Sequence, residues 1–207
     1  MAIARFLERL LEHPMVYAAS QAPFVEEKFA VIERHLRHQQ VRRVLDVGCG
    51  PGTNATRFPG AEYVGIDIND RYIDFARAKY PGHRFVQADL RTADLSSLGT
   101  FDTILVSSFL HHIPDDAVRR ILRQVPSLLG PDGTVHMLEL ISWERGSYVG
   151  ALALLDRGHY ARRVPAWREL FEEYFEPLSL EPHAFKAGLL LLLYFRGKAK
   201  PGLNGLP

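Results

Sequence analysis

The sequence predicts an α/β protein with a seven-stranded, mostly parallel sheet, an antiparallel C-terminal hairpin and helices on both faces of the sheet. Five short apolar runs lie between residues 41 and 140, and segments with helix caps or turn residues separate them. Alternation of strands and helices is typical of a parallel sheet that is covered on both sides. Two later apolar runs follow each other without a helix between them, which indicates an antiparallel pair.

Each predicted element has local signals at its ends. The parallel strands are expected at 41–47, 61–67, 83–88, 101–107 and 134–140, and the hairpin strands at about 178–183 and 188–195. Asn69 or Asp70 can cap a helix that runs to about Tyr80. Further helices are expected at 53–58 and 115–129, since proline and glycine follow both segments.

The N-terminal residues 1–40 predict two helices with a break near His13 and Pro14. The second helix is expected to begin near Pro23, because proline suits the first turn of a helix. Tyr17 and Gln21 would then lie at the break. The outer face of the second helix would carry Glu26, Glu27, Lys28, Arg34 and Arg37.

The whole chain is expected to form one main domain with additions at both ends. Residues 1–40 would pack on the core, and residues 41–198 would form the domain, with a helical insert at 142–175. Residues 199–207 are expected to be a flexible tail. Hydrophobic residues make up 47% of the 207 residues, which is enough for a substantial core.

Charge and cysteine content exclude some classes of protein. Lys and Arg number 25 against 24 Asp and Glu, and a formal charge of +1 gives no support for a general nucleic-acid binder. The single cysteine, Cys49, excludes an intramolecular disulfide. Together with the lack of a signal peptide and of an apolar run of about 18 residues, it favours a cytoplasmic protein without a membrane span.

The stretch from Val44 to Thr53 (VLDVGCGPGT) joins a strand to a glycine-rich turn. Its apolar residues suit a strand buried on both faces, and glycines at 48, 50 and 52 let the backbone lie close to a ligand. Asp46 is a carboxylate at the end of this strand, where burial without a partner is costly. We expect Asp46 to meet a cationic or hydrogen-donating ligand group at the carboxyl edge of the sheet.

Two more acids follow the next two predicted strands. Asp67 lies 19 residues after Gly48 (67 − 48), and Asp89 follows the third strand. Since parallel strands end at one edge of the sheet, acids at three successive strand ends indicate a single ligand site. A nicotinamide-dependent enzyme is the rival, but its G-x-G-x-x-G fingerprint places the third glycine five residues after the first. Here Gly52 follows Gly48 by four residues (52 − 48), which counts against that class.

These segments resemble the cofactor motifs of class I S-adenosylmethionine-dependent methyltransferases, which share a Rossmann-like, seven-stranded sheet. Val44–Thr53, Tyr63–Asn69 and Phe85–Leu90 look like those motifs. Residues 101–115 (FDTILVSSFLHHIPD) resemble the corresponding segment of the subgroup that includes quinone-biosynthesis and many other small-molecule methyltransferases. The resemblance covers residues 41–140 in its motifs and extends to residue 196 in topology.

The resemblance implies that the chain binds S-adenosyl-L-methionine and releases S-adenosyl-L-homocysteine. Asp46 would accept hydrogen bonds from the ammonium group, Asp67 from the ribose hydroxyls and Asp89 from the adenine amino group. The Leu90 amide would donate to adenine, Ile68 would pack on its face, and the N-terminal helices would form a lid. The implied cofactor residues are Asp46, Gly48, Cys49, Gly50, Gly52, Asp67, Ile68, Asp89, Leu90, Ser107, Tyr17 and Gln21.

The end of the fourth strand decides the chemistry, because the transferred methyl group points there in this family. The Asn/Asp-Pro-Pro-Tyr/Phe sequence of adenine amino-methyltransferases is missing, and Cys49 is expected to be a packing residue rather than a nucleophile. We find no set of metal ligands near this strand. His111 or His112 is the candidate general base. Positioning alone, worth an effective molarity of about 10⁵ M or above, is the alternative.

The substrate is expected to be a small-molecule methyl acceptor, with transfer to oxygen, nitrogen or carbon left open. Arginine suits the recognition of anionic groups, so the insert is expected to bind the acceptor, although an exposed, salt-bridged helix would have a similar composition. The candidate substrate residues are His111, Arg157, His159, Tyr160 and Arg162. The alternatives are an RNA or protein methyltransferase and a cofactor-binding subunit without catalysis, and both a monomer and a homodimer stay open.

Overall fold

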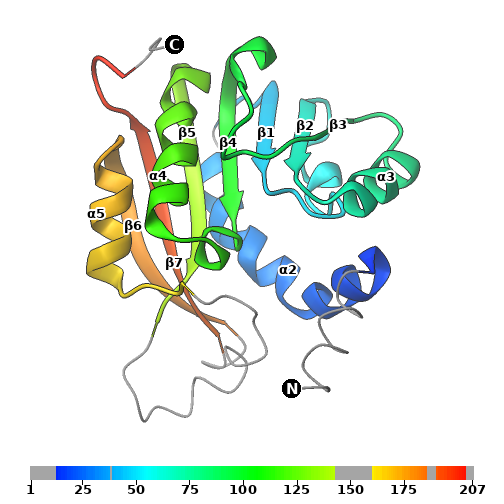
Figure 1. Ribbon diagram of the computed structural model, residues 1–207, viewed down its shortest axis with the longest axis horizontal. Helices are drawn as coiled ribbons and strands as arrows, with labels where there is room; N and C mark the ends of the chain where they lie inside the picture. The colour runs from blue at the N-terminus through cyan, green and yellow to red at the C-terminus, as the bar shows by residue number, and fades with distance from the viewer. Residues whose placement is uncertain (1–12, 38, 143–159, 186–189, 204–207) are drawn as a thin grey trace.

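The computed structural model describes residues 13–37, 39–142, 160–185 and 190–203. Their seven strands form one sheet in the order β3-β2-β1-β4-β5-β7-β6 (Figure 1). β1 pairs in parallel with β2 and β4, as do β2 with β3 and β4 with β5, whereas β7 is antiparallel to both β5 and β6. This topology confirms the predicted fold class.

The elements follow the predicted order along the chain. The strands are β1 Arg43–Val47, β2 Glu62–Asp67, β3 Arg84–Gln87, β4 Phe101–Ser107, β5 Leu129–Leu140, β6 Phe175–Phe185 and β7 Leu190–Ala199. The α-helices are α2 Pro14–Leu36, α3 Asp70–Lys79, α4 Asp115–Gln124 and α5 Val164–Glu172. Short 3₁₀ helices are η1 Ala55–Arg57, η2 Ser96–Leu98, η3 Leu110–His112 and η4 Val125–Leu128.

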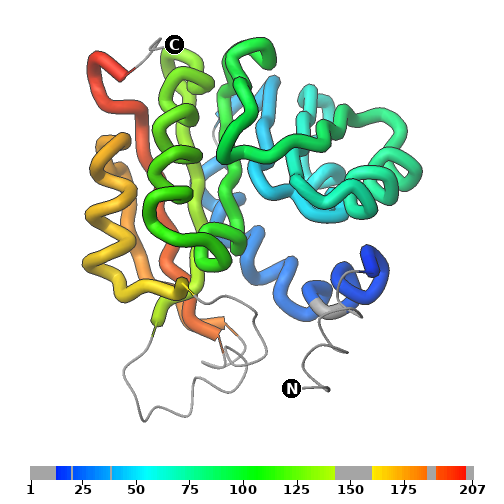
Figure 2. The backbone as a smooth tube through the Cα atoms, in the orientation of Figure 1, coloured from blue at the N-terminus to red at the C-terminus, as the bar shows by residue number. Residues whose placement is uncertain are grey.

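The sheet separates two apolar clusters, one on each face. On one face, α4 and α5 lie side by side over the sheet (Figure 2) and bury residues such as Ile121 and Phe171 against the strands. On the other face, α3 and the second half of α2 bury Ile73 and Ile32. Both faces of the central strands are therefore covered, which explains why the buried positions of β1 are apolar apart from Asp46.

The N-terminal region departs from the prediction. The predicted break near His13 is the start of α2, but the helix runs continuously from Pro14 to Leu36 and contains Pro23. The expected second start at Pro23 is therefore wrong, and Tyr17 and Gln21 lie on the helix rather than at a break. Pro23 is exposed, so water can satisfy the carbonyl that a proline leaves unpaired, and burial of the following turns keeps the helix intact.

Smaller differences arise where proline or glycine interrupts a pattern. The predicted helix 115–129 ends as α4 at Gln124 and continues as η4, because Pro126 has no amide hydrogen to donate. Residues 130–133, between the expected helix and the expected strand 134–140, lie inside β5, which starts at Leu129 and shifts register opposite Phe101 and Thr103. The α3 cap is confirmed, since the Asn69 side chain accepts a hydrogen bond from the Tyr72 amide at 3.2 Å.

The C-terminal part of the predicted insert and the hairpin are also described. α5 lies within the helical insert expected at 142–175, of which residues 143–159 lie outside the described residues. β6 and β7 form the predicted antiparallel pair at the sheet edge. In the part of the chain that the structure describes, no helix is both long and apolar enough to cross a membrane.

Candidate active site

The turn after β1 strongly favours glycine at three positions. Gly48, Gly50 and Gly52 have φ angles of 75°, 54° and 76°, a region that side chains rarely adopt. Space is also short, because a Cβ atom at Gly48 would lie 2.5 Å from the Phe109 ring and one at Gly52 would lie 2.9 Å from Phe85. The glycines therefore bring the backbone of this loop close to its surroundings.

Asp46 presents an unsatisfied oxygen at the base of this loop. Its side chain is only 1% exposed, and its Oδ2 accepts hydrogen bonds from the Tyr63 hydroxyl at 2.6 Å and the Asn54 amide at 3.0 Å. Its Oδ1 is buried without a hydrogen-bond partner. Burial raises the pKa of Asp46 to about 6, although these two donors oppose the shift. A ligand that supplies a cationic donor to Oδ1 would remove this cost.

Asp67 lies at the end of β2, beside the same loop. Its Oδ2 accepts from the Gly50 amide and its Oδ1 from the Asn69 amide, both at 2.9 Å. Burial raises the pKa of Asp67, and these backbone donors oppose the shift. Each oxygen keeps a second lone pair, so the carboxylate can still accept two hydroxyl groups of a ligand. The next residue, Ile68, is 53% exposed.

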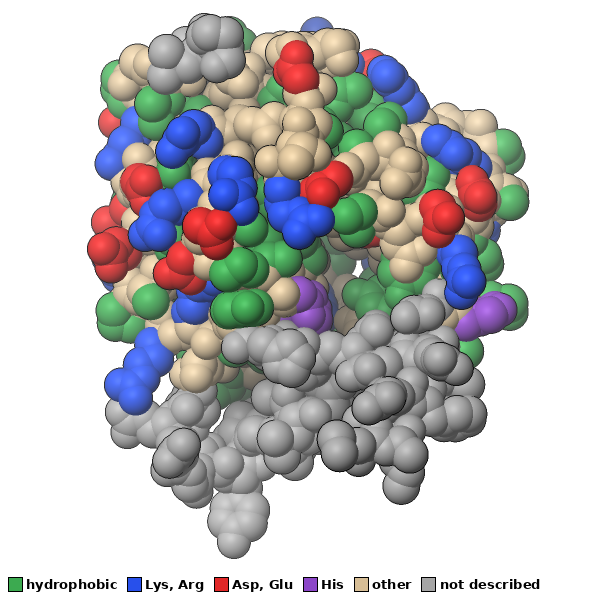
Figure 3. Space-filling model, viewed as in Figure 1, with side chains coloured by type: hydrophobic (Ala, Val, Ile, Leu, Met, Phe, Trp, Pro, Cys, Tyr) green, Lys and Arg blue, Asp and Glu red, His purple; other side chains and the backbone are tan. Residues whose placement is uncertain are grey.

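Two adjoining clefts surround the glycine loop, and Figure 3 shows a hollow with a histidine at its rim on this side of the molecule. One cleft includes Asp46, Lys28 and Ser107 among its lining residues. The other includes Asp67 and His112. The residues that line both clefts are Tyr17, Gly48, Gly50 and Ser108.

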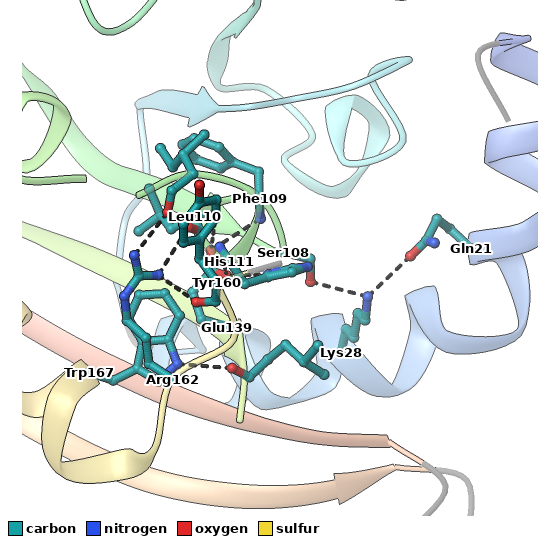
Figure 4. Close-up of polar contacts among 12 residues, drawn as sticks. Gln21, Lys28, Ser108, Phe109, Leu110, His111, Glu139, Tyr160, Arg162 and Trp167 are labelled. Atoms are coloured by element: carbon teal, nitrogen blue, oxygen red, sulfur yellow. Dashed lines mark hydrogen bonds and ion pairs between the residues drawn. The ribbon is translucent and has the colours of Figure 1, made fainter. Parts of the chain in front are cut away.

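Lys28 is a site residue that the sequence reading missed, since it was expected on the outer face of its helix. Its Nζ donates to Gln21 Oε1 and to Ser108 Oγ, both at 3.2 Å (Figure 4). With α2 unbroken, Tyr17, Gln21 and Lys28 stand four and seven residues apart on one helix face. This spacing was the available signal. It places a lysine in the same cleft as the unsatisfied oxygen of Asp46.

Asp89 and Leu90 line neither of these clefts. Asp89 is held by Arg91, whose Nε and Nη2 donate to its two oxygens at 2.8 and 2.7 Å. This pairing lowers the pKa of Asp89 to about 2. Leu90 is buried, and its carbonyl accepts from Gln124. Cys49 is buried as well, and burial raises the pKa of its thiol, as suits a packing residue.

The two candidate catalytic histidines have different surroundings. His111 is 1% exposed, and its Nδ1 lies 2.7 Å from the Glu139 carboxylate. His112 is exposed and lines the cleft that contains Asp67. The two rings lie 4.2 Å apart between centroids. A ligand in this cleft can reach His112, whereas His111 belongs to the wall behind it.

Two buried side chains, Glu139 and Arg162, form hydrogen bonds to the backbone of the loop after β4 (Figure 4). Glu139 accepts hydrogen bonds from the amides of Phe109, Leu110 and His111 at 3.1, 3.0 and 3.3 Å. Arg162 is 8% exposed and donates to the carbonyls of Leu110, Ile113 and Tyr160 and to the Asp115 carboxylate. Neither role could be read from local sequence, because both residues come from distant elements.

These contacts bear on the predicted substrate residues. The Arg162 contacts engage all three nitrogens of its guanidinium, so the structure places it as a support of the loop rather than as a free anion binder. Tyr160 is 42% exposed, and its amide donates to the His111 carbonyl at 2.9 Å. Arg157 and His159 lie outside the described residues.

Comparison with known sequences identifies the domain. Residues 44–133 match the family model described as a methyltransferase domain. The chain is 31% identical over 156 residues to a ubiquinone biosynthesis O-methyltransferase of Xanthomonas euvesicatoria pv. vesicatoria (strain 85-10), across 72% of this chain and 63% of that protein. It is 29% identical over 157 residues to the protein of the same name from Bordetella avium (strain 197N), across the same two shares. The chain thus spans less than two thirds of the length of these relatives.

Solved structures share the fold. The N-methyltransferase NodS from Bradyrhizobium japonicum WM9, in complex with S-adenosyl-L-homocysteine, matches with a TM-score of 0.74 at 16% identity, over 94% of this chain and 97% of that one. The PH0226 protein from Pyrococcus horikoshii OT3 matches with a TM-score of 0.67 at 17% identity, over 89% and 92%. At these identities the likeness concerns the fold alone. With the sequence match, it follows that the chain carries a methyltransferase domain of the class I, Rossmann-like type, the class that uses S-adenosylmethionine.

Proposed function

We propose that this chain is an S-adenosylmethionine-dependent methyltransferase that acts on a small-molecule acceptor. One observation carries the proposal: the glycine loop is flanked by two carboxylates, Asp46 and Asp67, and by the Lys28 ammonium in adjoining clefts. An amino-acid group and a ribose joined through one sulfur atom need this set of partners, namely an anion, a cation and an acceptor of two hydroxyl hydrogens.

The amino-acid end of the cofactor fits the cleft that holds Asp46 and Lys28. The Oδ1 of Asp46 is buried without a hydrogen-bond donor, and the ammonium group would supply that donor. The carboxylate would accept from Lys28, whose Nζ already donates to Ser108 and Gln21 across the cleft. Charge-assisted hydrogen bonds of this kind are about twice as strong as neutral ones.

The adenosine end fits the neighbouring cleft. Asp67 would accept the ribose hydroxyls, and the exposed Ile68 would pack on adenine. Asp89 and Leu90 stay predictions for the adenine edge, because Arg91 holds Asp89 here. Tyr17 and Ser107 complete the walls around the glycine loop, and α2 would act as the lid that brings Tyr17, Gln21 and Lys28 to the site.

The chemical step needs little more than alignment and one proton acceptor. When bound, S-adenosylmethionine supplies the methyl group that is transferred. His112, exposed in the cleft, would take the proton of an acceptor hydroxyl or amine. His111 would hold the loop through Glu139 rather than touch the acceptor. Oxygen is the first acceptor atom to test, since the curated relatives are named O-methyltransferases.

The acceptor, location and assembly complete the proposal. Tyr160, Arg157 and His159 follow the site in the chain and are our candidates for acceptor contacts. We further propose a cytoplasmic enzyme, active as a monomer or a homodimer, that does not act on nucleic acid. Size-exclusion chromatography with light scattering measures the assembly directly.

Calorimetry with S-adenosylmethionine and S-adenosylhomocysteine tests the cofactor. The wild-type chain should bind both, and Asp67→Ala should bind both at least about tenfold more weakly, because hydrogen bonds to a charged group are lost. Absence of binding by the wild type would refute the proposed function.

The Lys28 assignment has its own test. Lys28→Met should weaken the binding of S-adenosylhomocysteine by about tenfold. It should leave the binding of 5′-methylthioadenosine unchanged, since that ligand lacks the amino-acid group. Arg37→Met, which removes an exposed cation at the end of the same helix, is the matched control and should change neither ligand. Equal losses for both ligands in Lys28→Met would contradict the assignment.

A further inference from the structure

The Phe109 ring lies directly on the glycine loop. A Cβ atom at Gly48 would be 2.5, 2.8 and 3.0 Å from three carbons of this ring, so the ring touches the backbone there. Phe109 also lines the cleft that contains Asp67 and His112. No motif of the sequence drew attention to it, because a phenylalanine after a buried strand is ordinarily a core residue.

The backbone on both sides of Phe109 is fixed by buried contacts. Its own amide donates to Glu139 at 3.1 Å, and the next two amides donate to the same carboxylate. Arg162 donates to the carbonyl of Leu110 at 3.2 Å (Figure 4). The preceding residue, Ser108, has a φ of 57°, which is uncommon for a residue other than glycine. The backbone that carries the ring is therefore held in place.

The two clefts meet beside this ring. They share Gly48 and Gly50, while Asp46 lies only in one and Asp67 only in the other. If the proposed function is right, the amino-acid group lies in the first cleft and the ribose in the second. The sulfonium is the atom that joins those two groups, so it has to lie at the shared residues, next to the backbone that Phe109 covers.

We propose that the Phe109 ring stabilises the positive sulfonium, so that the chain binds S-adenosylmethionine in preference to S-adenosylhomocysteine. A cation within about 6 Å of a ring centroid is attracted by the negative face of the ring. After transfer, the methyl carbon is bonded to the acceptor and the electron pair of the broken bond stays on sulfur, which is then a neutral thioether. The attraction ends at that moment, which favours release of the product.

Other aromatic residues at the site are less suited to this role. Tyr17 reaches both clefts, but its ring pairs with Tyr72 at 5.3 Å between centroids. Tyr72 lines only the cleft of Asp67. Loss of the Tyr72 ring should therefore change the affinities for charged and neutral cofactors equally, which makes Tyr72 the control for Phe109.

The test compares three ligands by calorimetry: S-adenosylmethionine, sinefungin, which carries an amine at the position of the sulfonium, and S-adenosylhomocysteine. Phe109→Leu should weaken the two charged ligands about three- to tenfold and the neutral one less than twofold. Phe109→Met, which keeps most of the volume without the ring, should show the same difference between charged and neutral ligands. Phe109→Tyr, which keeps an aromatic ring, should not show this difference. Tyr72→Leu should change all three ligands by the same factor.

The outcomes separate this inference from the proposed function. Equal losses for the three ligands in both Phe109→Leu and Phe109→Met, or no loss in either, would overturn the role of the ring while leaving the cofactor assignment in place. Failure of the wild type to bind any of the three ligands would overturn both. Thermal melting of each variant confirms that the folded protein is the species measured.

Discussion

At the scale of single residues, Asp46 carries the cofactor assignment. One of its oxygens is saturated by Tyr63 and Asn54, and the other is buried without a donor. Burial of a carboxylate costs free energy unless a partner compensates it, so this side chain destabilises the folded state of the free protein. A bound ammonium group would supply the compensation. The same residue therefore lowers the stability of the free protein and provides affinity for the ligand.

The raised pKa of Asp46 predicts a pH-dependent affinity. Only the ionised carboxylate can accept both from its protein donors and from a ligand ammonium, and its pKa in the free protein is about 6. The affinity for S-adenosylhomocysteine should therefore be level above pH 7 and fall by up to about tenfold per pH unit below 6. Calorimetry between pH 5 and 8 measures this. Asp46→Asn should bind weakly at all pH values without the decline, and a wild-type affinity that held constant to pH 5 would contradict the account.

Gly48 predicts a second effect at the residue scale. Gly48→Ala would place a Cβ atom 2.5 Å from the Phe109 ring in a backbone with φ of 75°. The strained backbone alone costs about 1–3 kcal/mol, and the Phe109 ring must move as well. We expect a lower free energy of unfolding and loss of cofactor binding, measured by urea denaturation and calorimetry. Gly60 has a φ of 81°, but a Cβ atom there would have no atom within 4 Å. Gly60→Ala therefore separates backbone strain from the clash and should leave binding intact.

At the scale of elements, local signals predicted what local contacts determine. The cap at Asn69, the parallel strands and the C-terminal hairpin followed from capping chemistry and apolar runs. The path of α2 through Pro23 could not be predicted, because it depends on burial against α3 and the sheet. Lys28 was misplaced because its charge was taken to indicate an outer position, although it stands four residues before the buried Ile32 and the helical period puts both on one face.

The loop after β4 shows the same limit in the site itself. Its histidines were visible as a motif, but their division into a buried residue and an exposed one depends on Glu139 and Arg162. Glu139 is 28 residues from His111 in sequence, and Arg162 is 52 residues from Leu110. Contacts across such separations are decided by the sheet topology. No spacing rule in one sequence reveals them.

This clamp predicts a stability effect of its own. Glu139→Leu would leave three amides and the His111 ring without their acceptor, and each buried donor left unsatisfied costs about 1–3 kcal/mol. We expect a loss of at least about 2 kcal/mol in the free energy of unfolding, with faster amide exchange in residues 108–113. Arg168→Met on α5 is the control, because its pair with Glu172 is exposed, at 3.5 Å, and such pairs contribute under about 1 kcal/mol. A Glu139→Leu variant as stable as the control would refute the clamp.

At the scale of the whole molecule, buried ionisable groups of opposite behaviour lie at different places on the sheet. Asp46 and Asp67, at the cofactor edge, have raised pKa values. His136 on β5 is buried near Arg196 and His35. Burial lowers its pKa to about 3, and the positive charges of Arg196 and of protonated His35 add to this shift. Its ring nitrogens lie 2.9 Å from the Tyr194 hydroxyl and 3.0 Å from Thr134 Oγ1. One region thus favours proton uptake on folding and the other opposes it.

These opposed groups predict how stability depends on pH. The unfolded state binds a proton at His136 below pH 6.5 and the folded state does not, so this residue lowers stability by about 2 kcal/mol between pH 8 and pH 5. His35 and His183, whose pKa values burial also lowers, act in the same direction. Asp46 acts oppositely, because its pKa is raised on folding and its cost begins to decrease as pH falls below about 6. The wild-type protein should therefore lose little stability over this range.

Removal of Asp46 exposes the histidine contribution. In Asp46→Asn, the free energy of unfolding measured in urea should fall by about 2 kcal/mol or more from pH 8 to pH 5, since the carboxylate no longer offsets His136. The carboxylates with lowered pKa values, such as Asp89, titrate below this window. Adding His136→Phe to that variant should remove most of the fall, although it also removes the hydrogen bonds to Tyr194 and Thr134. An equal fall in both variants would show that protonation of His136 does not control acid stability.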